Sequence, residues 1–331
     1  MTGPLVVAAA VVAIALAPLV ASTYHVLLML PFMAYAVVLL GLNLLLGYAG
    51  LVSFGHALFI GIGAYTGAFL TSHFKIRSLE VILIAAAALG ALVAAPVGAL
   101  CVRYVKIYFG MLTLAFGMVF YTFVLKFYRL TGGDEGTPFL RPSLLGRSLE
   151  AMPKTDYLVG PYYYYSLGVV VVATLCMWRI VHSPFGLCLK TIRDNPAKAE
   201  TLGIGVTRFR FHAFVISAVY AAVGGALLGP PIGNVDPTLA YWTHSGNIVF
   251  MTLLGGFTSF FGPVVGAFVF IYLQNWVMSV VPYWRLIFGA ILAAIVIFAP
   301  GGLLGLVRPG RAAVRAAGRR GAGAPPAESR P

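Results

Sequence analysis

Residues 162–210 read YYYYSLGVVVVATLCMWRIVHSPFGLCLKTIRDNPAKAETLGIGVTRFR. In this stretch an apolar run lies directly before a polar segment. The run, residues 162–182, has the length of the roughly 20 apolar residues that cross a bilayer as one helix. The segment 182–210 carries five Lys or Arg and two acidic residues. A polar segment beside such an apolar run indicates a membrane helix that ends in an aqueous loop.

The rest of the chain repeats the apolar part of this pattern. Hydrophobic residues make up 60% of the 331 residues, charged residues 9%, and the mean hydropathy is +0.95. This composition predicts an all-α fold, a polytopic transmembrane helix bundle with about ten spans in one membrane domain, residues 1–307. The predicted spans are 5–21, 25–46, 55–71, 79–101, 107–129, 162–182, 211–230, 246–261, 263–281 and 286–307. Glycine-rich parts of these spans are candidates for re-entrant segments.

The first apolar run allows two interpretations. It could be a cleaved signal peptide, because Val20-Ala21-Ser22 resembles a cleavage site. The preceding residues MTGP carry no Lys or Arg, which a signal peptide requires. We therefore expect residues 5–21 to be retained as a span.

Basic residues orient the predicted bundle. Arg103, the segment 182–210 and the Arg-rich tail 308–331 fall on one side of the ten-span arrangement, which the positive-inside rule makes cytoplasmic. Both termini are then cytoplasmic, the loop 130–161 lies outside, and the basic tail is expected to be disordered. The two sets of five spans begin on opposite faces, as an inverted-topology repeat requires.

The sequence excludes several classes of function. The formal charge of +13 is spread over short loops and the tail, which argues against nucleic-acid binding. The three cysteines have no CxxC spacing, and we expect no metal site and no cofactor in this chain. It has no G-x-x-x-x-G-K-[ST] phosphate loop, no HExxH and no G-x-S-x-G, so we expect no enzyme activity. Acidic residues are almost absent from the spans, which disfavours ion coupling.

The glycine-rich segment 41–70, GLNLLLGYAGLVSFGHALFIGIGAYTGAFL, is the first candidate site. Its glycines, Gly63 among them, permit an unwound backbone that lines a pathway, with Asn43, Ser53 and His56 as polar groups. Plain helix packing through small residues explains the same pattern. For His56 alone, we favour a hydrogen-bonded packing role over contact with a ligand.

The polar segment contains a second candidate. Asp194-Asn195 followed by Pro196 predicts a helix start, and Gly203 predicts its end, giving a short helix Pro196 to Leu202. Such a short helix is marginal by itself in water. It could dock into a partner ATPase as a coupling helix, within a coupling loop 183–210, or it could merely connect two spans.

Several segments resemble one family when taken together and in order. They are Gly41-Leu42-Asn43-Leu44-Leu45-Leu46-Gly47-Tyr48-Ala49-Gly50, Ser53-Phe54-Gly55-His56-Ala57, Gly63-Ala64-Tyr65, Thr131-Gly132-Gly133, Arg193-Asp194-Asn195, Gly203-Ile204, Gly255-Gly256 and Gly262-Pro263-Val264-Val265-Gly266-Ala267. The chain thereby resembles the bacterial ABC permeases for branched-chain amino acids, specifically the LivM branch.

The resemblance implies an inner-membrane permease that pairs with a second, homologous permease. Two ATP-binding ABC subunits would supply ATP hydrolysis from the cytoplasm, and a periplasmic amino-acid-binding protein would deliver the substrate. It also assigns roles to residues of this chain. ATPase coupling would fall to Arg193, Asp194, Asn195, Ala199, Glu200 and Gly203. Apart from the resemblance, we expect Gly255 and Gly256 to line the substrate path.

Three points stay open after the resemblance. Lys198 and Thr201 stand where the family usually has small apolar residues, which bears on docking detail. The substrate is a branched-chain amino acid or, in related permeases, urea or a short amide. An ATP-independent channel or facilitator is a further alternative.

Overall fold

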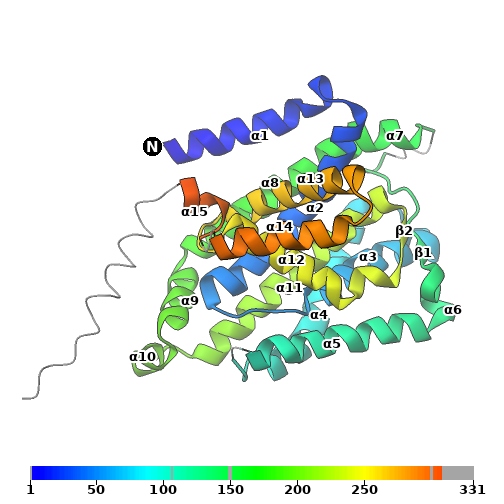
Figure 1. Cartoon of the computed structure of the whole chain (residues 1–331). Helices are drawn as coiled ribbons and strands as arrows, with labels where there is room; N and C mark the ends of the chain where they lie inside the picture. Colours follow the sequence, from blue (N-terminus) through cyan, green and yellow to red (C-terminus); the bar gives the residue numbers. More distant parts are fainter. Residues whose placement is uncertain (1, 106, 148–150, 299–300, 308–331) are drawn as a thin grey trace, which may run out of the picture.

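The computed structural model describes residues 2–105, 107–147, 151–298 and 301–307. These residues form a bundle of α-helices with one short antiparallel strand pair (Figure 1). The predicted tail 308–331 lies outside them. The α-helices are α1 (Thr2–Val20), α2 (Thr23–Asn43), α3 (His56–Ser72), α4 (Leu79–Cys101), α5 (Ile107–Lys126), α6 (Tyr128–Thr131), α7 (Lys154–Tyr157), α8 (Tyr163–His182), α9 (Pro184–Asp194), α10 (Pro196–Thr201), α11 (Val206–Ile232), α12 (Trp242–Gly255), α13 (Gly262–Val280), α14 (Trp284–Phe298) and α15 (Leu303–Val307). Between them lie the π-helical turns η1 (Leu44–Ala49) and η3 (Leu158–Tyr162), the 3-10 turns η2 (Gly133–Glu135) and η4 (Pro237–Ala240), and the strands β1 (Thr137–Pro138) and β2 (Asn234–Val235).

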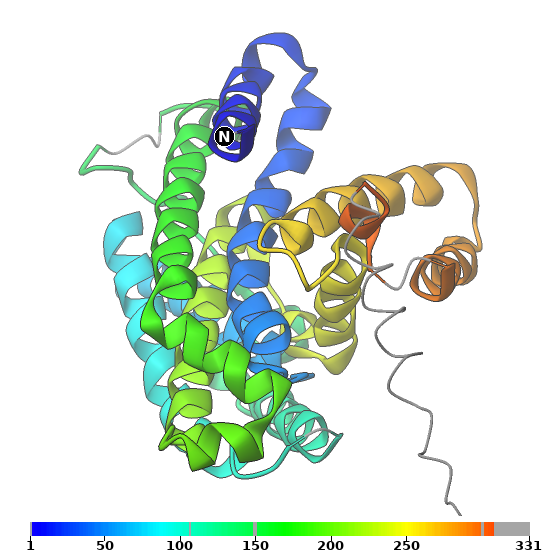
Figure 2. The same ribbon diagram turned by 90° about the vertical axis from the view of Figure 1, so that its left-hand side faces the viewer.

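Helix α11 lies at the centre and packs against α2, α3 and α4 (Figure 2). Glycines let these backbones approach each other. A Cβ at Gly63 of α3 would overlap the carbonyl oxygen of Ala222, and a Cβ at Gly225 of α11 would overlap that of Ile60. Close contact of this kind stabilises helix pairs in lipid, where helices gain little from burying apolar surface against each other.

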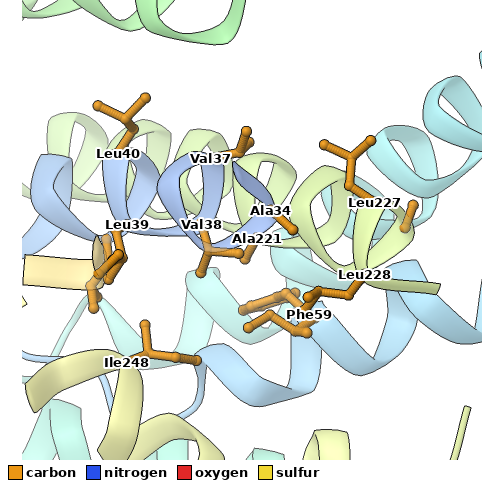
Figure 3. Close-up of a cluster of buried hydrophobic side chains, with 14 of the residues drawn as sticks. Ala34, Val37, Val38, Leu39, Leu40, Phe59, Ala221, Leu227, Leu228 and Ile248 are labelled. Carbon is orange, nitrogen blue, oxygen red and sulfur yellow. The ribbon is translucent and has the colours of Figure 1, made fainter. Parts of the chain in front are cut away.

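The apolar core fills the space around α11. Figure 3 shows Val38 of α2, Phe59 of α3 and Ile248 of α12 directed into the same layer as Ala221 of α11. All four side chains are at most 1% exposed. Four helices, α2, α3, α11 and α12, therefore meet at the middle of the bundle.

Six described helical segments are long and apolar enough to cross a membrane. They are Thr23–Ala49, Leu79–Cys101, Ile107–Lys126, Lys154–His182, Val206–Ile232 and Gly262–Val280. Helix α3 has 17 residues, at the lower end of the range for a complete span, and α12 has 14, which is shorter than that range. The span count of about ten and the inverted repeat stay predictions.

Some helices end elsewhere than predicted. The predicted span 246–261 ends as α12 at Gly255, because Gly256 has a positive φ of 99° that an α-helix does not continue. The predicted span 211–230 is longer, since α11 begins at Val206 inside the polar segment. The predicted span 286–307 is divided between α14 and α15.

The two predicted loops lie at opposite ends of the bundle (Figure 1). The segment 183–210 forms α9, α10 and the start of α11 at one end. The loop 130–161 forms short elements at the other end, where β1 pairs with β2 through Thr137 and Val235. Residues 148–150 of this loop lie outside the described part. The placement of the two loops on different sides of a membrane stays a prediction.

Candidate functional site

A polar cluster at mid-bundle surrounds His56, the first residue of α3. Its Nδ1 lies 2.9 Å from the Ser53 hydroxyl, and its Nε2 lies 2.7 Å from the Ser217 hydroxyl of α11. The His56 side chain is 1% exposed. Because both ring nitrogens have partners, the geometry favours the packing role, in which His56 ties the start of α3 to α11.

The first turn of α12 adds two polar contacts to this level of the bundle. His244 Nε2 lies 3.2 Å from the Tyr35 hydroxyl of α2, and the Ser245 hydroxyl accepts a hydrogen bond of 2.9 Å from the Ala57 backbone N–H. Tyr35 lies near the middle of the 27-residue segment Thr23–Ala49, and Ser217 near the middle of the 27-residue Val206–Ile232. The cluster is therefore at mid-depth.

Tyr35, Ser217, His244 and Ser245 are not among the site residues predicted from the sequence. The polar run at 242–247, WTHSGN, stands among apolar residues and was the signal that could have pointed to α12. For Ser217, a single serine in an apolar helix gives no comparable signal.

The predicted break in the glycine-rich segment is real. The π-helical turn η1 ends at Gly50, whose φ is 72°, and α3 starts only at His56. Protein groups bind the freed backbone: the Leu51 N–H donates to the Leu45 carbonyl at 3.0 Å, and the Phe54 N–H to the Thr113 hydroxyl at 3.3 Å. Irregular backbone in a membrane requires partners of this kind.

Asn43 lies away from this cluster, beside the loop 256–261 that joins α12 to α13. Its side-chain amide donates to the carbonyl oxygens of Ser259 and Phe260, at 3.2 and 3.4 Å. Gly255 and Gly256 flank the same loop, where a Cβ on Gly255 would overlap the Gly262 carbonyl. The six predicted path residues thus form two groups, with Asn43, Gly255 and Gly256 in one and Ser53 and His56 in the other, while Gly63 packs against α11.

The short helix of the polar segment forms as α10, one residue shorter than predicted. The Asn195 side chain caps it by accepting from the Lys198 N–H at 3.0 Å, and Pro196 occupies the first helical position. Gly203, with φ of 79°, ends it. The cap, the proline and the terminating glycine act as their sequence order predicts.

One face of α10 packs and the other is open. Ala199 is fully buried against Ile192 of α9 and Val206 of α11. Glu200, the next residue, is exposed, and Leu202 just beyond the helix is 67% exposed. The helix is held on its bundle side and free on its outer side.

The side chain of Arg193, at the end of α9, points toward η1. Its guanidinium donates to the Gly47 carbonyl oxygen of η1 and forms an ion pair with Asp194 at 3.2 Å. Gly47 in turn packs between the Asn43 side chain and the Phe257 carbonyl. A continuous series of contacts therefore runs from the polar segment through η1 to the loop 256–261 and α12.

Comparison with known proteins gives one family and several relatives. The family described as "Branched-chain amino acid transport system / permease component" matches residues 24–299. The chain is 27% identical to the high-affinity branched-chain amino acid transport system permease protein LivM of Salmonella typhimurium, over 84% of this chain and 69% of that protein. It is 24% identical to LivH of the same organism, over 71% of this chain and 79% of LivH.

A third relative carries a different substrate in its name. The nucleoside ABC transporter permease protein NupC of Lactococcus lactis is 34% identical over 98 residues, which is 29% of this chain and 27% of NupC. No solved structure matches the chain.

Proposed function

This chain belongs to the branched-chain amino acid transport permease family, and from that premise we propose that it is the membrane subunit of an ATP-driven importer in the bacterial inner membrane. Its substrate is a branched-chain or related hydrophobic amino acid. A second, homologous permease completes the membrane part, two ATP-binding subunits bind from the cytoplasm, and a periplasmic amino-acid-binding protein delivers substrate from outside. Both termini are cytoplasmic.

The observation that carries the proposal is the position of α10. It is a capped helix at one end of the bundle, with Ala199 packed inward and Glu200 exposed outward. A partner that moves α10 also moves α9, and Arg193 transmits that motion to η1 through its bond with Gly47. Arg193 thus acts on the membrane side of the coupling loop, while Glu200 faces the motor.

Two variants test the coupling. Glu200→Lys reverses a charge on the exposed face, and Gly203→Pro forbids the positive φ that ends α10, because proline fixes φ near −65°. We expect both to abolish ATP-dependent uptake by the assembled transporter while membrane insertion stays normal. Glu200→Gln, which keeps size and loses only charge, should retain more uptake than Glu200→Lys. Wild-type uptake in both test variants, at equal protein level, would show that α10 does not couple the permease to the ATP-binding subunits.

The substrate needs a separate measurement. The local similarity to NupC favours a nucleoside as the second candidate, and urea or a short amide is the third. Unlabelled leucine, guanosine and urea should be compared as competitors of labelled leucine in vesicles that contain the complete transporter. We expect leucine to compete and the other two not to. Leucine flux in vesicles that lack the ATP-binding subunits would instead support a facilitator.

A further inference from the structure

Helix α12 carries a polar face that points out of the bundle. Thr243, Gly246, Asn247 and Phe250 follow the i, i+3, i+4, i+7 spacing that places residues on one side of a helix. Thr243 and Asn247 are exposed, and a Cβ at Gly246 would meet nothing within 4 Å. The opposite side of the same turns is buried, with Ser245 bound to the Ala57 N–H and Ile248 in the core (Figure 3).

This face lies at mid-depth. His244, between Thr243 and Asn247, contacts Tyr35 near the middle of the segment Thr23–Ala49. Groups at this depth on an outward face meet lipid tails unless something else covers them. Other outward faces at similar depth are apolar, as shown by Leu92 of α4, Val119 of α5 and Val172 of α8, which are 67%, 67% and 60% exposed.

Two threonines elsewhere on outward or partly exposed helix surfaces bond to their own helix. The Thr122 hydroxyl donates to the Met118 carbonyl at 2.9 Å, and the Thr174 hydroxyl to the Val170 carbonyl at 2.7 Å. Bonds of this type let a polar side chain face hydrocarbon. Within the described part of the chain, the side chains of Thr243 and Asn247 make no such bond, so lipid would leave both unsatisfied.

We propose that this face of α12 lines the path along which the substrate crosses the membrane, with Thr243 and Asn247 as hydrogen-bonding groups for the polar end of the substrate. The proposal rests on the proposed permease function and adds which helix face lines the substrate path. The hydroxyl and the amide carry no charge, which suits a small molecule without net charge. Trp242 and Phe250, 48% and 42% exposed, supply apolar surface beside them for a hydrocarbon side chain.

The face is also connected to the motor end of the bundle. Helix α12 ends at Gly255 and leads into the loop 256–261, which Asn43 binds and Gly47 contacts. The Arg193 contact with Gly47 therefore reaches the helix that carries the polar face. A motion of the coupling loop can change the exposure of this face without any contact between substrate and ATPase.

Cysteine accessibility tests the proposal in cells that express the complete transporter. The variants are Asn247→Cys and Thr243→Cys, the control is Val172→Cys on the outward face of α8, and the probe is a membrane-impermeant methanethiosulfonate. The unsubstituted chain, in which Cys101 is buried and Cys176 exposed, gives the background. Only a thiol in water forms the reactive thiolate readily.

We expect both α12 variants to be labelled and leucine to slow the labelling, while Val172→Cys stays at background. Labelling of the α12 variants no faster than Val172→Cys would overturn the proposal. So would labelling that occurs only when the second permease is absent, because the face would then be a protein contact.

The outcome also separates this proposal from the proposed function. If guanosine or urea slows the labelling and leucine does not, the face of α12 lines the substrate path but the substrate is not a branched-chain amino acid. If the transporter takes up leucine with ATP while its Asn247→Cys thiol is not labelled, the proposed permease function stands. The proposal that this face of α12 lines the substrate path is then wrong.

Discussion

The guanidinium of Arg193 donates a hydrogen bond to the carbonyl oxygen of Gly47, 146 positions earlier in the chain. Gly47 lies in η1, the last turn of the long helix that begins at Thr23, and Gly50 ends that turn in a left-handed conformation. The last carbonyls of a helix have no partner within it and carry the negative end of its dipole. Arg193 therefore closes the end of this helix with a charge of the favourable sign.

Removing the Arg193 contact should uncouple the transporter. A hydrogen bond to a charged group contributes about 1.5–3 kcal/mol, which corresponds to roughly tenfold or more in an equilibrium constant. We expect Arg193→Ala to lower substrate transported per ATP hydrolysed by about that factor while ATPase activity persists. Arg179→Ala, which removes an exposed cation from the last turn of α8, is the matched control and should keep the wild-type ratio. An unchanged ratio in Arg193→Ala would show that the contact does not transmit motion.

Replacing Asn43 should release the loop 256–261. Asn43→Leu keeps approximate size but cannot donate to the Ser259 and Phe260 carbonyls, so these groups lose their partner. We expect faster backbone hydrogen exchange in residues 256–261 and reduced uptake. Asn275→Leu, whose amide bonds only to the Ile271 carbonyl of its own helix, should leave exchange in the loop unchanged. Equal exchange in both variants would argue against Asn43 as the anchor of the loop.

Removing the Ser217 hydroxyl should destabilise the fold without altering substrate affinity. Ser217→Ala leaves the buried Nε2 of His56 without its partner, which costs about 1–3 kcal/mol. We expect a lower midpoint of thermal unfolding for the purified protein and an unchanged KM for uptake. Ser279→Ala, at an exposed serine bonded to its own helix, should show neither effect. A raised KM in Ser217→Ala would instead indicate that the His56 cluster contacts substrate.

Adding one methyl group at Gly63 should separate α3 from α11. The Cβ of Gly63→Ala would overlap the Ala222 carbonyl oxygen, a backbone atom that cannot turn aside. Overpacking of this kind costs about 1–3 kcal/mol, so the unfolding midpoint should fall. Gly168→Ala, in α8 with nothing within 4 Å of the new Cβ, should be neutral or stabilising by up to about 1 kcal/mol. Equal midpoints would mean that the glycine contact is not what holds the two helices together.

Sequence patterns that act locally predicted the structure well. Asn195, Pro196 and Gly203 specify the start and end of α10, because capping and backbone conformation depend on residues within one helical turn. The glycine-rich segment predicted an interrupted backbone, and the structure has one between Gly50 and His56. The end of α12 at Gly255 was not predicted, although the positive φ of Gly256 that ends it is also a local feature.

The sequence by itself determined that this is a helical membrane protein with one long polar segment between its apolar runs, since lipid requires long apolar helices and leaves charge at their ends. The family match supports the same conclusion. Only the tertiary structure decided that Arg193 turns inward to Gly47 and that Thr243 and Asn247 face outward. The reason is that lipid-facing and core-facing sides of a membrane helix are both apolar, so periodicity does not tell them apart. The direction of a polar side chain depends on which distant helix lies beside it.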